Sequence, residues 1–205
     1  MEKKQIIMKN ESSKISWELF INMFKQAATK YADNYELTDE IRNIVADVWT
    51  WLNGSDQRRA FYIAGRTGTG KTTLCNILFD TFKALNIFYT YDNRFYALSP
   101  IGRKEIDINT EYMKTGQFEL LNRGSIFIDD FGMNKKIMYM GNEVYPMEEI
   151  LMRRLDDLKY TYTFFSSNYP IDHNIIKEKY GERIADRLKY NCMYFVLNGK
   201  NFRNG

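Results

Sequence analysis

The chain of 205 residues is 44% hydrophobic and 16% aromatic, which is enough for one domain with a substantial core. Its 29 basic and 26 acidic side chains leave a net charge of +3, too mild to indicate a nucleic-acid binder beyond a local basic patch. With two cysteines, Cys75 and Cys192, and one histidine, His173, the composition excludes a Cys/His zinc site and argues against a disulfide scaffold.

The N-terminal stretch MEKKQIIMKNESSK carries charges but lacks the apolar segment of a secretion signal. No part of the chain approaches the roughly 18 consecutive apolar residues that cross a bilayer. We therefore expect a cytoplasmic protein that does not act in a membrane. Residues 1–14 are predicted to form a disordered tail.

Two amphipathic helices are predicted within residues 15–54. Ser16 is expected to cap the first, in which apolar side chains recur every three or four positions. Thr38 precedes the second helix, which Asn53 and Gly54 end. These helices are predicted to form a short N-terminal extension ahead of an α/β core at residues 55–205.

Apolar runs alternate with helical stretches through the rest of the chain. The runs are Ala60–Ala64, Ile87–Tyr91, Ile126–Asp129, Thr161–Ser166 and Met193–Leu197. The predicted helices between them are 70–84, 105–122, 147–159 and 173–189. Because the runs are apolar throughout, they are predicted to be strands buried on both faces, and their alternation with helices indicates a mainly parallel α/β sheet.

The first run leads directly into GRTGTGKT, residues 65–72, and then into a helical stretch. This is the GxxxxGK[ST] pattern of a phosphate-binding loop (P-loop) in its strand–loop–helix context. Its glycines let backbone N–H groups surround an anion, Lys71 is expected to reach the β- and γ-phosphates, and the Thr72 hydroxyl is expected to bind Mg²⁺. The predicted nucleotide-binding residues of the loop are Gly65, Arg66, Thr67, Gly68, Thr69, Gly70, Lys71, Thr72 and Thr73.

A second element, SIFIDDFG, is an apolar strand that ends in two carboxylates. Ligands bind at the carboxyl edge of open α/β sheets, which is where such a strand places its charges. Asp129 is predicted to hold Mg²⁺ through its water shell, and Asp130 to orient and polarise the attacking water. A strand-end turn stabilised by aspartates is the plainer interpretation, which the upstream P-loop disfavours.

The next strand ends in FFSSNYP, so Asn168 is expected beside Asp129 and Asp130. An amide donates and accepts hydrogen bonds, and can therefore hold the attacking water or contact the γ-phosphate. Asn168 followed by Tyr169 and Pro170 is also a common turn sequence.

In this order, GRTGTGKTTL, FIDDFG, FFSSNYP and GERIADRL resemble the AAA+ ATPases of the DnaC/DnaI helicase-loader type and the related IstB transposition helpers. The closing FVLNGKNFR is similar to the ending of that group, and the resemblance covers roughly residues 38–205. It implies a parallel sheet of five strands, ATP bound between protomers of a homo-oligomer, and loading of a replicative helicase on single-stranded DNA. The chain leaves room for little or no lid domain.

The resemblance also implies roles for individual residues. Asn168 corresponds to sensor 1, which monitors the γ-phosphate. Arg187 matches the arginine finger that reaches the γ-phosphate of a neighbouring subunit, and Arg203 matches sensor 2, which contacts the phosphates of its own subunit. Arg183, four residues before Arg187, shares its predicted helix face and is a second candidate for the finger.

Several functions remain open at this point. The first is a DnaC-like loader, or alternatively an IstB-like transposition helper with a transposase as its partner. The next is a P-loop nucleoside monophosphate kinase, in which Arg183 and Arg187 would clamp phosphates of their own subunit. The last is a module that binds nucleotide without hydrolysing it.

Basic residues occur next to aromatic ones in Asn93–Tyr96 and Lys135–Tyr139, and Arg103 and Lys104 form another basic pair. Such combinations can hold phosphates and stack the bases of single-stranded DNA. They are equally typical of a solvated surface, so both interpretations stay open.

Overall fold

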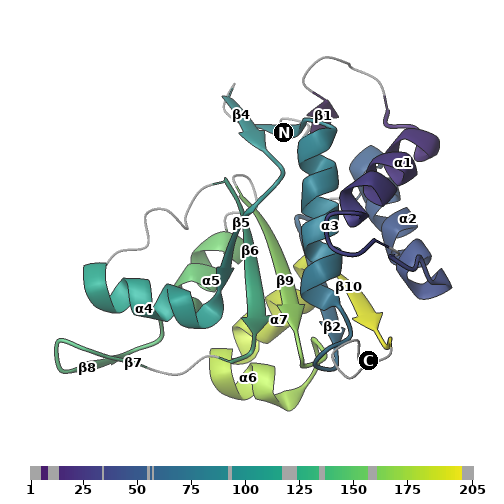
Figure 1. Cartoon of the computed structure of the whole chain (residues 1–205). Helices are drawn as coiled ribbons and strands as arrows, with labels where there is room; N and C mark the ends of the chain where they lie inside the picture. The colour runs from purple at the N-terminus through teal and green to yellow at the C-terminus, as the bar shows by residue number, and fades with distance from the viewer. Residues whose placement is uncertain are drawn as a thin grey trace. The chain divides into compact units, whose positions relative to one another are not determined.

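The computed structural model describes residues 6–8, 14–33, 35–54, 56, 58–91, 94–116, 124–133, 137–156 and 161–199 (Figure 1). The chain divides into two compact units. The first comprises Met1–Gln57 and Thr72–Ser99, and the second comprises Arg58–Lys71 and Pro100–Gly205. The sequence predicts a boundary at residue 55, between the helical extension and the α/β core. The two units do not follow that boundary, and it stays a prediction. None of the described helices is long and apolar enough to span a membrane.

Three helices belong to the first unit: α1 (Trp17–Ala28), α2 (Asp39–Asn53) and α3 (Lys71–Ala84). Only the first residue of α3, Lys71, is counted with the second unit. The predicted N-cap of α1 is confirmed, and Thr38, predicted to precede α2, is the N-cap of that helix. Ser16 Oγ accepts a hydrogen bond from Leu19 N at 3.2 Å, and Thr38 Oγ1 accepts one from Ile41 N at 3.3 Å. Each hydroxyl satisfies a backbone N–H group that has no partner within its helix.

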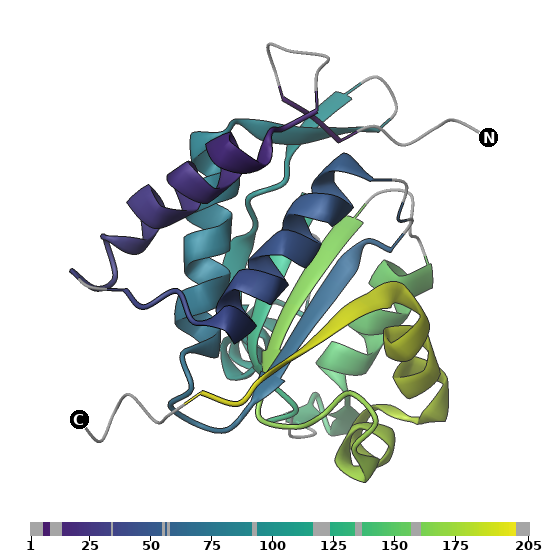
Figure 2. The ribbon, with the colours of Figure 1, turned by 90° about the vertical axis from the view of Figure 1, so that its right-hand side faces the viewer.

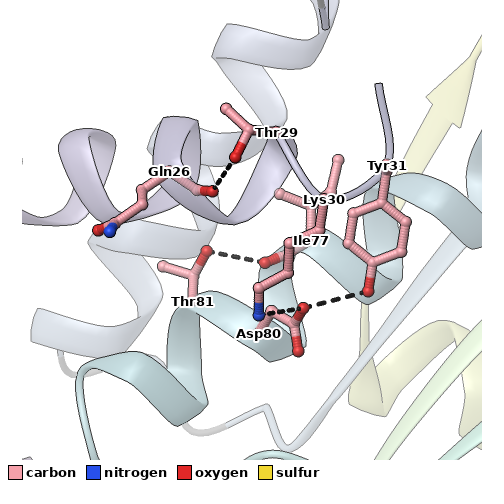
Figure 3. Close-up of polar contacts among 7 residues, drawn as sticks. All are labelled: Gln26, Thr29, Lys30, Tyr31, Ile77, Asp80 and Thr81. Carbon is pink, nitrogen blue, oxygen red and sulfur yellow. Dashed lines mark hydrogen bonds and ion pairs between the residues drawn. The ribbon is translucent and has the colours of Figure 1, made fainter. Parts of the chain in front are cut away.

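Asp80 of α3 joins that helix to the end of α1 (Figure 3). Lys30 Nζ lies 3.0 Å from Asp80 Oδ2, and the hydroxyl of Tyr31 donates to the same oxygen at 3.2 Å. Burial, followed by the charge of Asp80, raises the pKa of Tyr31. Nearby, the hydroxyls of Thr29 and Thr81 donate to carbonyls of the preceding helical turn. Because Lys30 is exposed, its ion pair contributes little stability.

A small antiparallel sheet in the first unit has the order β1-β3-β4. Its strands are β1 (Ile6–Met8), β3 (Ile87–Tyr91) and β4 (Arg94–Ala97). The prediction that Ile87–Tyr91 joins the parallel sheet is therefore wrong: only two residues separate it from β4, and so short a connection forces antiparallel pairing. Ile6–Met8, assigned to a disordered tail from the sequence, instead pair with β3.

The second unit contains a five-stranded sheet in the order β10-β2-β9-β6-β5, and every pair in it is parallel. Its strands are β2 (Ala60–Gly65), β5 (Ile101–Lys104), β6 (Gly124–Phe131), β9 (Thr161–Ser167) and β10 (Cys192–Leu197). The predicted five-stranded parallel α/β sheet is confirmed. The sequence missed its fifth member, β5, because Ile-Gly-Arg-Lys is exposed at all four positions and lacks an apolar run.

Helices of the second unit pack together on one face of this sheet. They are α4 (Glu105–Thr115), α5 (Pro146–Asp156), α6 (Asn174–Tyr180) and α7 (Glu182–Asn191). The green and yellow ones are seen side by side in Figure 2. A short hairpin of β7 (Ile137–Tyr139) and β8 (Asn142–Val144) precedes α5. The single helix predicted at 173–189 is two helices, because Gly181 adopts a left-handed φ of +82° between them.

Arg154 of α5 is buried and holds the beginnings of two strands. Its guanidinium donates to the Thr163 hydroxyl at 2.8 Å and to the carbonyls of Tyr162 and Gly124 at 2.8 and 2.9 Å. These bonds place β6 and β9 side by side at the amino edge of the sheet. The opposite edge, where both strands end, carries the candidate site.

Candidate functional site

The P-loop connects the end of β2 to the start of α3, as the motif requires. Gly68 and Gly70 have φ values of +85° and +87°, which side chains rarely adopt. A Cβ on Gly65 would lie 2.3 Å from the carbonyl oxygen of Leu197. Glycine suits these positions, and a loop of this kind can turn its backbone N–H groups toward an anion. Such a loop fits the phosphates of the predicted nucleotide.

Lys71 is 6% exposed, and its ammonium group donates three hydrogen bonds. Nζ lies 2.8 Å from Gly65 O, 2.9 Å from Arg66 O and 2.9 Å from Asn168 Oδ1. The first two contacts hold the lysine over its own loop. The third joins the P-loop to the end of β9, so the structure brings together two residues that the sequence predicted for one site.

Asp129 and Asp130 stand at the end of β6, where the pairing with β9 shifts register between Ile128 and Phe131. The Ser166 hydroxyl of β9 donates to Asp129 Oδ1 and accepts from the Asp130 N–H at 3.3 Å. An irregular strand end of this kind redirects side chains, and Ser166 fixes its geometry. Sequence reasoning missed Ser166; its only signal is its place two residues before Asn168.

Asp130 has a φ of +56°, an uncommon conformation for a residue other than glycine. Its carboxylate is 47% exposed, and Oδ2 lies 3.9 Å from Nζ of Lys104, the last residue of β5. Lys104 is also a candidate DNA contact from its sequence, which stays a prediction. The Asp130 side chain is therefore accessible, as the predicted water-orienting role requires.

The turn that follows Asp130 is held by a buried carboxylate. Glu105, the first residue of α4, accepts hydrogen bonds from the Gly132 N–H at 3.0 Å and from the Tyr180 hydroxyl at 2.6 Å. Burial raises the pKa of Glu105 from 4.5 to about 7, although these bonds and the charge of Lys179 oppose the shift. Burial, and then the charge of Glu105, raise the pKa of Tyr180. Sequence reasoning did not identify either residue.

The remaining predicted residues have different outcomes. Thr72 and Thr73 lie in the first turn of α3, directly after Lys71, while Arg66 and Thr67 are exposed in the loop. Arg187 is half-buried on α7, and its Nη1 lies 3.9 Å from Met152 Sδ of α5. The Arg203 position lies outside the described residues, as do Lys135 and Lys136.

Mg²⁺ is predicted to bind at Thr72 and Asp129, whose hydroxyl and carboxylate oxygens are the hard ligands that this ion takes. Within the described parts of the chain, no three His, Cys, Asp or Glu side chains gather into a metal cluster. At phosphate sites Mg²⁺ usually takes one or two protein oxygens and shares the rest of its ligands with phosphates and water, and a hydroxyl and a carboxylate are donors of that kind.

Sequence comparison finds no matching family model and no matching curated protein. Solved structures, however, share the fold. DnaI is 16% identical with a TM-score of 0.59, covering 91% of this chain and 93% of that one. The DnaC helicase loader is 15% identical with a TM-score of 0.53, covering 82% and 95%. AMPPCP-bound DnaA from Aquifex aeolicus is 16% identical with a TM-score of 0.54, covering 82% and 50%.

At these identities the likeness establishes the fold. The chain has the α/β architecture of DnaI, DnaC and DnaA, so the predicted fold, a five-stranded parallel sheet flanked by helices, is confirmed. The resemblance inferred from the order of the motifs agrees with these structures in fold.

Proposed function

We propose that the chain is a DnaC-like helicase loader, a cytoplasmic DNA-replication ATPase that acts on a replicative helicase and single-stranded DNA. The contact between Lys71 and Asn168 carries the proposal, because it joins the P-loop to the strand end next to Asp129 and Asp130. The likeness to DnaI and the DnaC helicase loader supports the replication role, and the likeness to AMPPCP-bound DnaA supports ATP as the ligand.

In the proposed mechanism, the loop N–H groups and Lys71 bind the β- and γ-phosphates. Asp129, to which the Ser166 hydroxyl donates a hydrogen bond, would hold Mg²⁺ together with Thr72. When bound, Mg²⁺ neutralises the charge of the phosphate oxygens. Asp130 orients the attacking water and accepts its proton, and the Asn168 amide holds that water at the γ-phosphate.

A neighbouring subunit completes the proposed site through Arg187, whose fixed guanidinium stabilises charge on the γ-phosphate. Since α7 leads directly into β10, its C-terminal end lies at the amino edge of the sheet and its first turn at the carboxyl edge. Arg183 is exposed and lies about 6 Å nearer that carboxyl edge than the half-buried Arg187. Arg183 is therefore the alternative finger. Arg203 is proposed to contact the phosphates of its own subunit.

ATP hydrolysis per protomer is the measurement that tests the proposal. Because the site is shared, the rate per protomer should rise several-fold with protein concentration and again when single-stranded DNA is added. Lys71→Ala should abolish hydrolysis, since it removes the charge that compensates the phosphates. Co-purification with a helicase, as opposed to a transposase, separates the loader from the transposition helper.

Other outcomes would contradict the proposal. Saturation by a nucleoside monophosphate, with no response to DNA or protein concentration, would identify a kinase. ATP binding without turnover under every condition would identify a nucleotide-bound module. A rate per protomer that does not change with protein concentration would exclude the shared site.

Mixed assemblies test where Arg187 acts. Arg187→Ala and Asp130→Asn are each expected to be inactive, because each lacks one half of every shared site. Mixing the two should restore part of the hydrolysis, through interfaces that pair an intact Arg187 with an intact Asp130. The same mixing with Arg183→Ala identifies which arginine is the finger. Intact assembly without any recovery would show that Arg187 does not act in trans.

A further inference from the structure

The turn at Phe131–Gly132 follows Asp130 directly, and side chains bind both the N–H group and the carbonyl of Gly132. The Gly132 N–H lies 3.0 Å from Glu105 Oε2 and 3.0 Å from the Tyr180 hydroxyl. The Gly132 carbonyl accepts from Lys179 Nζ at 2.5 Å. Helices α4 and α6 thus hold one residue of the turn through its backbone.

Two further contacts restrict the same turn. The Ser167 hydroxyl donates to Phe131 O at 2.6 Å. Gly132 has a φ of +101°, and a Cβ there would lie 2.7 Å from the Tyr169 ring. The backbone after Asp130 is therefore fixed by hydrogen bonds and by packing, with no freedom to reorient one residue without breaking several contacts.

Asp130 itself is held in the left-handed region, at φ +56°. A residue other than glycine persists in such a conformation only where its surroundings over-determine it, and such residues cluster at functional sites. The Ser166 hydroxyl holds the Asp130 N–H group directly, and the hydrogen bonds to Gly132 constrain the backbone two residues further on.

A purely structural role does not explain the choice of Glu105. The side chain is 1% exposed, and burying a carboxylate carries a desolvation cost that well-packed apolar residues avoid. In return, a carboxylate gives a backbone N–H group and a hydroxyl strong, directional acceptors. That property matters where a backbone segment must be placed accurately.

We propose that Glu105 and Tyr180 are positioning residues for ATP hydrolysis, which fix the turn carrying Asp130 through the N–H group of Gly132. This inference rests on the proposed role of Asp130 as the residue that orients the attacking water. Neither side chain contacts the substrate in this scheme. Both act through the backbone that aims Asp130.

Glu105→Gln and Tyr180→Phe test the proposal, because each keeps the size of the side chain and weakens the hold on Gly132. Each variant should lower kcat about tenfold or more, since small misplacements of a catalytic group have large effects, and KM for ATP should stay within about twofold. In the nucleotide-free protein, hydrogen exchange at the Gly132 amide should accelerate about tenfold, because its protecting bond is weakened.

Thr163→Val is the matched control. It removes a buried hydrogen bond to Arg154 at the amino edge of the same sheet, so it should destabilise the fold without changing kcat or the exchange of Gly132. The proposal is overturned if Glu105→Gln keeps wild-type kcat, or if its loss of kcat is no larger than that of Thr163→Val. A wild-type chain that does not hydrolyse ATP overturns the proposed function and this positioning role together. The exchange measurement separately decides whether Glu105 holds the turn.

Discussion

Asp130→Asn is expected to lower kcat for ATP hydrolysis by about 10²–10⁴-fold, the range found when a catalytic acid or base is removed. An amide can still contact water but cannot accept its proton. Asparagine is also among the few residues that tolerate a left-handed backbone, so the φ of +56° at this position is preserved. Affinity for ATP should change little, because binding depends on the P-loop. Single-turnover hydrolysis and equilibrium binding of a fluorescent ATP analogue measure the two effects separately.

The choice of asparagine matters for this experiment. Alanine at position 130 would add about 1–2 kcal/mol of backbone strain to the chemical effect. Glu182→Gln neutralises an exposed carboxylate on α7 and should leave kcat unchanged, which controls for the loss of one negative charge. If Asp130→Asn retained wild-type turnover, the water would have to be activated by another group.

Much of the fold was predictable, because the central strands of the sheet have a clear signal in the sequence. β2 and β9 lie between other strands and read as continuous apolar runs. The edge strand β5 carries no such signal, because it is polar and exposed, although the other edge strand, β10, is an apolar run. The apolar run at Ile87–Tyr91 pairs in another sheet. Apolar character predicts that a strand is buried, but it does not say which sheet buries it.

The candidate site divides in the same way. Lys71 and Asn168 were predictable because each follows the end of a recognisable strand, Lys71 within the P-loop motif after β2 and Asn168 directly after β9. Parallel strands bring such ends to one edge of the sheet. Glu105 was not predictable, since a single glutamate at the start of a helix reads as a favourable first-turn charge. Its partner Tyr180 lies 75 residues away, and only the folded chain shows that the two side chains meet at Gly132.

Stability should depend on pH through Glu105. Burial raises the pKa of this carboxyl from 4.5 to about 7, so between these values the folded chain holds a proton that the unfolded chain has lost. By linkage, this contribution is fully present below about pH 4.5 and declines by about 1.4 kcal/mol per pH unit as pH rises. It levels off above about pH 7, after a total loss of about 3 kcal/mol. Denaturant unfolding of the wild type and of Glu105→Gln measures the difference.

The groups around Glu105 sharpen this prediction. Tyr180, Lys179 and Tyr62 face it, and burial raises the pKa of both tyrosines well above the window, so neither titrates there. Tyr180→Phe removes a hydrogen bond that lowers the pKa of Glu105, and should therefore move the decline to higher pH. Glu182, whose pKa is lowered by its hydrogen bond to Lys177, should change stability with pH in the opposite direction. Its small contribution to folding stability is present above its ordinary pKa and is lost as pH falls. Parallel stability curves for the wild type and Glu105→Gln would mean that Glu105 titrates alike in the folded and unfolded chains, and would rule out a pKa raised by burial.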